Sequence, residues 1–391
     1  MKFAHLSDCH IGGWREDTLR DLNLKSFEKA IALCIENYVA FVIIAGDLFD
    51  TALPSIEILK QTARILSILR EHDIAVYVIP GSHDFSASGK TMLDVLEHAG
   101  LLHNVMKFEN GKLQFTLDKT GVKLTGIYGK KGGLETVDYE SLEKQHLEEE
   151  KGFKIFLFHT LFTELKPKEF QMIETRSISI LPKGFNYYAG GHPHFTYAKY
   201  HEHYGMLTYP GPIYPNNFEE LERLKQGSFI LVETKDTTLD VQHIPLNIVE
   251  TVSYVLSAEN KTPLQVEEEI LTTVIDYTGK IITLRIEGCL SSGKVSELDF
   301  KKIFEHFKDA YLVLKNTTKL TTKEFKELFV ELRNVDEIES TLIKEHLSQS
   351  CYPEDTLLQL MASLDTEKLE GEKITDFEGR ILKDLSKVIE L

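Results

Sequence analysis

FAHLSDCHIGG, residues 3–13, begins as an apolar strand and ends in polar and small residues. The strand runs directly into Asp8 and His10, and two glycines close the stretch. A single Asp-x-His after a strand is weak evidence of chemistry, because such an aspartate commonly caps a turn. Further strands of this chain also end in aspartate or histidine, so these strand ends have to be interpreted together.

Apolar runs that stop abruptly at Gly, Asp or His recur in the first 250 residues. They are YVAFVIIAGD (38–47), IAVYVIPGSHD (74–84), KIFLFHT (154–160) and FNYYAGGHPH (185–194). Strands this continuously apolar are buried on both faces, and helical patterns at 21–37 and 55–73 lie between them. The pattern predicts an α/β domain whose sheet is covered by helices. Ligand sites in such folds collect beyond the carboxyl ends of the strands, where all five polar clusters fall.

The composition limits the protein class. The 391 residues suit two or three domains, and the 42% hydrophobic content is ample for globular cores. A net charge of −17 argues against holding nucleic acid by bulk electrostatics alone. Without a long apolar run or a signal peptide, we expect a cytoplasmic protein. Four cysteines without C-x-x-C pairing are expected to be reduced thiols.

The pattern changes near residue 250. Residues 263–277, 280–290, 296–310 and 311–316 read as helix, strand, helix and strand, which is enough for a small α/β domain. Thr321 to Glu324 resembles a capping box, and an acidic, helix-rich region follows. We therefore expect three parts: 1–250, 251–320 and 321–391.

Two apolar stripes mark the last part. The longer consists of Ile374, Phe377, Ile381, Leu385 and Val388, and the shorter of Leu357, Leu358, Met361 and Leu364. Both have helical spacing. They either pack on the protein's own core or bind helices of another protein.

The polar clusters share ligand chemistry. Their members are Asp8, His10, Asp47, His83, Asp84, His159, His192 and His194. Mixed carboxylate and imidazole ligation suits manganese, iron or zinc. The set is too large for one ion, so we expect two ions bridged by a carboxylate, an arrangement that promotes phosphoryl displacement. Gly190 and Gly191 are expected to let the backbone approach the metals.

Taken in order, the motifs DCH, GDLFD, GSHD, FHT and GHPH resemble the calcineurin-like metallophosphoesterases. Within them, MKFAHLSDCHIG, GDLFDTALPS and YPGPIYPNNFEE are most similar to the SbcD-type nucleases. The resemblance covers residues 1 to about 235. It implies a two-sheet sandwich flanked by helices, a small α/β capping domain and a helical module that binds an SMC-like ABC ATPase. It also implies a homodimer that cuts DNA with two divalent ions, most commonly Mn²⁺, in double-strand-break repair.

The resemblance also implies a role for each motif residue. Asp8, His10 and His194 would hold one ion, Asp47 would bridge both, and His159 and His192 would hold the second. His83 would be a catalytic histidine that is not a ligand, with Asp84 orienting its ring. A histidine in a tight turn after a strand is suited to general acid catalysis when a carboxylate keeps its pKa up.

Two positions depart from the family pattern. Ser82 stands where the family usually has the asparagine of Gly-Asn-His-Asp. Because a serine hydroxyl is a shorter and weaker neutral ligand, we expect the second ion to bind loosely or to keep an extra water. Asp50 stands where many members have histidine, so a role of that histidine in guiding DNA does not transfer.

Two other functions remain open. One is a phosphatase or phosphodiesterase for a small phosphoester or a phosphoprotein, and the other is a scaffold without activity, of which Ser82 would be a sign. The first is disfavoured by the 140 residues beyond the metal core, and the second by the otherwise complete ligand set. Trp14 is expected to pack rather than to stack on a base. His201 and His203 are expected to be exposed strand histidines, and Lys130 and Lys131 a solvated turn.

Overall fold

The computed structural model describes residues 1–85, 91–130, 136–168, 175–235, 238–323, 356, 359, 364 and 374–388. The chain divides into two compact units. The first comprises 1–256, 267–286 and 299–318, and the second comprises 257–266, 287–298 and the described part of 319–391.

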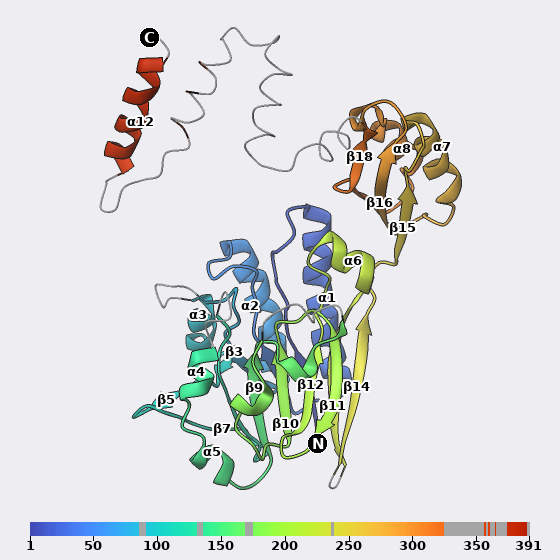
Figure 1. Cartoon of the computed structure of the whole chain (residues 1–391). Helices are drawn as coiled ribbons and strands as arrows, with labels where there is room; N and C mark the ends of the chain where they lie inside the picture. The colour runs from blue at the N-terminus through green and yellow to red at the C-terminus, as the bar shows by residue number, and fades with distance from the viewer. Residues whose placement is uncertain are drawn as a thin grey trace. The chain divides into compact units, whose positions relative to one another are not determined.

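The first sheet of the larger unit carries the amino-terminal strand near its centre. Figure 1 shows the chain, with the amino terminus marked N in this unit. The strand order of this sheet is β14 (Thr238–Leu246), β13 (Gly227–Lys235), β1 (Lys2–Leu6), β2 (Phe41–Ala45), β3 (Ala75–Ile79), β4 (His103–Asn104). Strands β1 to β4 are parallel, and β13 is antiparallel to β1. The carboxyl ends of β1, β2 and β3 therefore share one edge.

The second sheet has the order β11 (Thr196–His201), β12 (Gly205–Pro210), β10 (Tyr187–Gly191), β9 (Lys154–His159), β8 (Lys123–Gly126), β7 (Thr116–Leu117). Strands β8, β9, β10 and β12 are parallel, whereas β7 and β11 are antiparallel to their neighbours. A separate hairpin pairs β5 (Phe108–Glu109) with β6 (Lys112–Leu113). All five strands expected from the sequence are confirmed.

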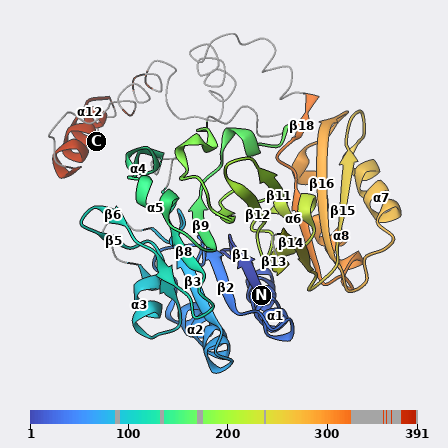
Figure 2. The ribbon, with the colours of Figure 1, turned by 90° about the horizontal axis from the view of Figure 1, so that it is seen from below.

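Side chains that alternate along each strand pack in different cores, one between the two sheets and one on each outer face. Ile43 of β2 and Leu157 of β9 share the core between the two sheets. Ile44 of β2 faces the other way, into a core with the helices α1, α2 and α3. Phe158 of β9 likewise turns outward, toward a core that includes residues of α4 and α5. Figure 2 shows these helices on the two outer faces of the sheets, so the expected sandwich flanked by helices is confirmed.

Capping residues explain where the larger helices begin. Glu16 accepts from the backbone N–H of Leu19 at the start of α1 (Asp17–Glu36), and the hydroxyl of Ser55 accepts from the backbone N–H of Ile58 at the start of α2 (Ile56–Glu71). The other helices of this sandwich are α3 (Met92–His98), α4 (Thr136–Ser141), α5 (Gln145–Glu149) and α6 (Phe218–Leu224). The prediction placed α1 four residues too late because it took the apolar pattern, and not the cap, as the beginning.

A third sheet follows residue 250. It consists of β15 (Thr251–Ser257), β16 (Ile281–Leu290), β17 (Leu312–Asn316) and β18 (Leu320–Thr322), with helices α7 (Pro263–Thr273) and α8 (Phe300–His306). The two expected strands and two expected helices are present, and β15 and β18 are additional. Thr321 and Thr322, expected to begin a helix, pair with Cys289 and Leu290 of β16, and the next residue, Lys323, is helical, so these threonines end a strand directly before a helical residue. Residues 324–355 lie outside the described part.

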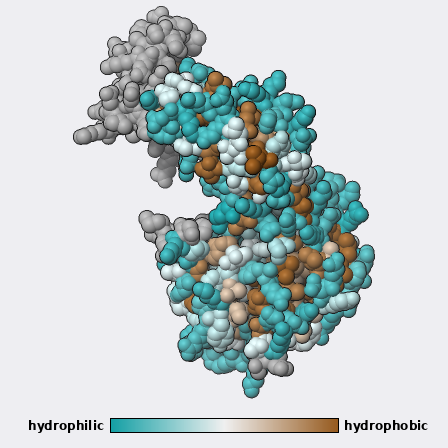
Figure 3. Space-filling view, turned by 90° about the vertical axis from the view of Figure 1, so that its right-hand side faces the viewer, coloured by the Kyte–Doolittle hydropathy of each residue, from teal (hydrophilic) through white to brown (hydrophobic). Residues whose placement is uncertain are grey.

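Helix α12 (Ile374–Val388) contains the longer apolar stripe expected from the sequence. Of the shorter stripe only Leu364 is described. No described helix is long and apolar enough to cross a membrane. On the face drawn in Figure 3, hydrophobic patches are small and lie among hydrophilic side chains. Cys9, Cys34 and Cys289 are buried free thiols, as expected, and Cys351 lies outside the described residues.

Candidate metal centre

The polar clusters meet where the parallel strands of both sheets end. Four of their residues, Asp8, His10, Asp47 and His192, have positive φ angles of 51°, 42°, 52° and 94°. Such conformations cost about 1–3 kcal/mol each and persist only where the surrounding structure enforces them. Their concentration at one place indicates a site built for function.

Glycines allow the strand ends to approach one another. A Cβ atom on Gly191 would lie 2.1 Å from the carbonyl oxygen of Ala45, and one on Gly46 would lie 2.2 Å from Nδ1 of His159. A Cβ on Gly190 would meet the rings of Phe158 and Tyr209. Gly190 and Gly191 were expected to bring backbone near the metals. The structure shows close packing at both positions: Gly191 lies against β2 of the other sheet, and its Cβ would also lie 2.8 Å from Nδ1 of His159, whereas Gly190 lies against aromatic rings.

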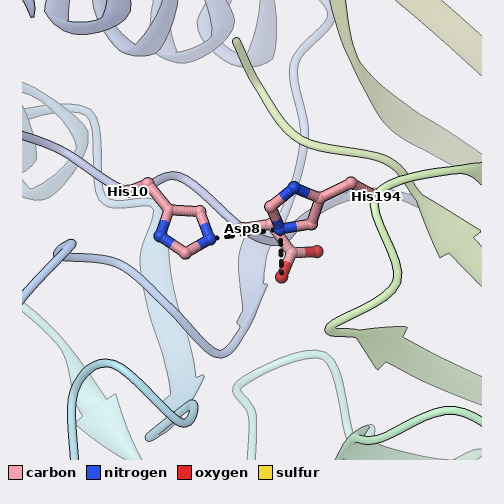
Figure 4. Close-up of side chains that lie close together, drawn as sticks. All are labelled: Asp8, His10 and His194. Carbon is pink, nitrogen blue, oxygen red and sulfur yellow. Dashed lines mark hydrogen bonds and ion pairs between the residues drawn. The ribbon is translucent and has the colours of Figure 1, made fainter. Parts of the chain in front are cut away.

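The first group of convergent side chains is Asp8, His10 and His194 (Figure 4). Nε2 of His10 lies 3.2 Å from Nε2 of His194, and Nε2 of His194 lies 3.8 Å from Oδ1 of Asp8. Asp8 is fully buried and is held by the hydroxyl of Ser7 at 2.6 Å and by the backbone N–H of His192 at 2.9 Å.

The second group is Asp8, Asp47 and His159. Nε2 of His159 lies 3.1 Å from Oδ2 of Asp47, which is itself 3.6 Å from Nε2 of His10. Asp47 therefore faces both groups, and Asp8 belongs to both. The ring of His192 lies 5.3 Å from that of His159, and the hydroxyl of Ser82 donates to Oδ2 of Asp47 at 3.4 Å.

Three of these imidazoles are held in the same way. Nδ1 of His10 faces Oδ1 of Asp50 at 3.2 Å, and Nδ1 of His194 faces Oε1 of Glu220 at 2.8 Å. Nδ1 of His159 faces the carbonyl oxygen of Ala45 at 2.8 Å. An acceptor at Nδ1 favours the tautomer with its proton there, so Nε2 presents a lone pair toward the cluster.

This donor set fits divalent cations. With Nδ1 protonated, the Nε2 atoms of His10 and His194 would face each other as two lone pairs at 3.2 Å, an arrangement that a cation between them stabilises. Buried carboxylates beside them supply the opposite charge. The oxygen and nitrogen ligands suit manganese, iron or zinc.

The pKa values of His159 and His192 are shifted by burial and by the charged side chains beside them. Burial alone would lower the pKa of His159, but the charge and hydrogen bond of Asp47 outweigh burial and raise it well above its usual value. Burial and the charge of His159 together lower the pKa of His192 to about 4. The carboxylates that stabilise a proton on His159 would also stabilise a metal ion.

His83 lies at the rim of the centre with 37% of its side chain exposed. Its ring stands edge-on to that of His10, with centroids 4.6 Å apart. Its Nδ1 faces the carbonyl oxygen of Asp50 at 2.7 Å, and its backbone N–H donates to Oδ1 of Asp47 at the same distance. His83 thus touches the centre and remains partly exposed.

Asp84 has a different role from the one expected. Its carboxylate accepts from the backbone N–H groups of Leu48, Phe49 and Gly81 at 3.0–3.1 Å. We expected Asp84 to orient the ring of His83. The structure instead places the carbonyl oxygen of Asp50 at Nδ1 of that ring. Asp84 fastens the turn after β3 to the loop after β2.

The other singled-out residues have structural surroundings. Trp14 donates from Nε1 to the carbonyl oxygen of Pro215 at 2.8 Å and packs with Leu19 and Tyr214, so its expected packing role is confirmed. His201 bonds to the hydroxyl of Tyr197 at 2.7 Å. His203 is largely exposed. Lys130 forms an ion pair with Asp138, and Lys131 lies outside the described residues.

Asp50 and Glu220 are the functional candidates that sequence reasoning missed. Each holds a histidine far away in the sequence: Asp50 is 40 residues from His10, and Glu220 lies on α6, after the last histidine pair. The only signal in the sequence is that both belong to the stretches that carry the family resemblance, GDLFD and YPNNFEE.

Comparisons with known proteins agree with this geometry. Residues 1–196 match the model of the calcineurin-like phosphoesterase family. The chain is 25% identical over 390 residues to a DNA double-strand break repair protein Mre11 from Archaeoglobus fulgidus, with 89% of this chain and 85% of the relative covered. It is 26% identical to the protein of that name from Methanocaldococcus jannaschii, covering 89% of each. For the Sulfolobus acidocaldarius protein the identity is 23%, with 97% and 99% covered.

Proposed function

Since this chain belongs to the calcineurin-like phosphoesterase family, we propose that it is a metal-dependent DNA nuclease of double-strand-break repair. The observation that carries the proposal is the pair of ligand groups that share Asp8 and have Asp47 between them. The substrate follows from similarity along nearly the whole chain to relatives named for double-strand-break repair.

In this proposal Asp8, His10 and His194 would hold one ion, His159, His192 and Ser82 would hold the second, and Asp47 would be shared by both. When bound, two divalent ions, which we expect to be Mn²⁺, would supply charge that stabilises the attacking and leaving oxygens of an in-line displacement. Asp50 and Glu220 keep the Nε2 atoms of His10 and His194 directed at the centre. The hydroxyl of Ser82, engaged by Asp47 at 3.4 Å, is the weakest of these donors.

His83 moves the proton. A carbonyl oxygen only accepts, so Nδ1 of His83 carries a proton; when Nε2 is protonated as well, Nε2 is the nitrogen that gives its proton to the leaving oxygen of the phosphodiester, and the ring becomes neutral. Its exposure at the rim allows contact with a phosphate. Asp84 acts through the backbone: by fastening both loops it holds Asp47 and His83 in register.

The parts beyond the metal centre are assigned to assembly. We propose that residues 1–250 form the nuclease domain, that residues 251–320 form a capping domain, and that residues 321–391 bind an SMC-like ABC ATPase. We also propose a homodimer, as the family resemblance implies; α2 and α3 carry the exposed apolar side chains Ile56, Ile68 and Val95.

The function is tested with labelled single-stranded and duplex DNA against p-nitrophenyl phosphate, each with Mn²⁺ or with a chelator. We expect Mn²⁺-dependent DNA cleavage that exceeds phosphomonoester hydrolysis. The reverse order would favour a phosphatase, and no turnover of either would favour a scaffold.

His83→Ala should reduce cleavage by about 10²- to 10⁴-fold, because a general acid is lost, while the manganese content stays unchanged. His203→Ala is the matched control, since that histidine is largely exposed and outside the centre. Loss of manganese in His83→Ala would make His83 a ligand and would contradict its assignment.

A further inference from the structure

We propose that Phe85, stacked on Tyr128, is a binding site for one nucleobase of the strand being cut, next to the scissile phosphate. This inference rests on the proposed nuclease function. It assigns to this chain a preference for strands whose bases are unpaired at the cut.

The two rings form a preformed stack. Their centroids are 5.6 Å apart and their planes are 13° from parallel. The ammonium of Lys130 lies 4.9 Å from the centroid of Tyr128 and also forms an ion pair with Asp138 at 2.7 Å. Tyr128 is thus held in place by its neighbours, and Phe85 is the exposed member, with 39% of its surface accessible.

The backbone fixes this stack to the metal centre. Phe85 follows His83 by two residues, and its N–H donates to the carbonyl oxygen of Gly81 at 3.2 Å. Tyr128 precedes Gly129, whose N–H donates to the carbonyl oxygen of Pro80 at 3.0 Å. A Cβ atom on Gly129 would lie 2.5 Å from Cδ2 of His159. The stack is therefore carried by the same turn as His83 and by a loop that contacts a proposed metal ligand.

Orientation distinguishes Phe85 from other exposed apolar side chains. Single exposed apolar residues are ordinary on protein surfaces, and Leu117 is an example here, at 66% exposed. Phe85 instead has its ring direction set by a parallel partner. Aromatic faces of this kind bind bases of any sequence, because every base has a π face.

The negative net charge of the protein makes a base-stacking site a useful source of affinity for DNA. With a net charge of −17, the chain is poorly suited to hold DNA through phosphate neutralisation. Stacking involves no counterion release, so it contributes to affinity at any salt concentration. A base can reach an aromatic face only after leaving its own stack, which is easiest in single strands and frayed ends.

The test is a series of labelled single-stranded oligonucleotides in which one nucleotide at a time is abasic, cut with Mn²⁺ by the full chain. At one position beside the cut, the abasic substitution should lower kcat/KM of the wild type by about tenfold or more. Phe85→Ala should cut the intact oligonucleotide slower by the same factor and should lose the dependence on that base. Phe85→Trp should keep both, and Leu117→Ala should behave as wild type. The ratio between intact and abasic substrates should be the same at 50 and at 200 mM salt.

Each other outcome overturns the inference. Equal cleavage by wild type and Phe85→Ala would show that Phe85 binds no base, while the nuclease function stands. Equal losses of Phe85→Ala on intact and abasic DNA, with Phe85→Leu restoring activity, would show a packing role. If the wild type cuts no DNA at all, the proposed function fails first, and the inference fails with it.

Discussion

At the scale of single residues, the centre depends on groups that direct its histidines. His10, His159 and His194 each have Nδ1 held by an acceptor, and two of those acceptors are carboxylates. A carboxylate behind an imidazole fixes the tautomer and makes the other nitrogen a stronger ligand. We therefore assign Asp50 and Glu220 to the candidate metal centre, together with the histidines they hold.

Glu220→Gln should weaken manganese binding by about 10- to 100-fold, because Nδ1 of His194 loses its charged partner. The change keeps the shape of the side chain, and titration calorimetry with Mn²⁺ measures it. Glu219→Gln on the same helix is the control, since the side chain of Glu219 is 78% exposed. Equal affinities in the two variants would show that Glu220 does not position His194.

At the scale of strands, one buried histidine connects the two sheets. Nδ1 of His5 on β1 bonds to the hydroxyl of Tyr187 on β10 at 2.9 Å and lies 3.3 Å from the hydroxyl of Thr208 on β12. Its Nε2 is buried without a hydrogen-bond partner among the described residues. Burial, followed by the charge of His243, lowers the pKa of His5 to about 3.

This lowered pKa makes stability depend on pH. The unfolded chain binds a proton at His5 below about pH 6.5, whereas the folded chain does so only near pH 3, so stability falls as the pH drops through this window. At pH 5 the loss due to His5 is about 2 kcal/mol. His5→Asn, which keeps a group near the Tyr187 hydroxyl, should show a smaller drop in Tm between pH 7.5 and pH 5 than the wild type. Parallel pH profiles in thermal unfolding would contradict this assignment.

Strand ends were predictable, and their partners were not. Each strand around the centre is an apolar run ended by Gly, Asp or His, so the position of Asp8, Asp47 and His159 followed from the sequence. The hydrogen bonds of Asp84 could not be predicted, because nearly every residue has a backbone N–H and the sequence does not show which of them a carboxylate will meet. Strands β15 and β18 were missed since β15 mixes exposed and buried residues and β18 has only three residues.

At the scale of the whole molecule, the acidic chain is proposed to work as part of a larger assembly. Because its net charge is −17, we propose that its DNA affinity comes from the metal centre, from base stacking and from a partner. Helix α12 is the candidate contact, with Phe377, Ile381 and Leu385 on one side and the largely exposed Leu382 beside them.

Ile381→Glu should weaken copurification with the SMC-like ATPase of the same organism by at least about tenfold, because a charge replaces a central apolar contact. Leu382→Glu introduces the same charge in the same helix and should have little effect. Both variants should still cut single-stranded DNA with Mn²⁺. If Ile381→Glu copurifies as well as the wild type, the stripe packs on this chain itself.

The most direct test of the two-ion centre is the anomalous scattering of a crystal of the full chain soaked in Mn²⁺. We expect two peaks, one among Asp8, His10 and His194 and the other among Asp47, His159 and His192. A crystal with these side chains ordered but no peak between them, or with a single peak elsewhere, would contradict the account.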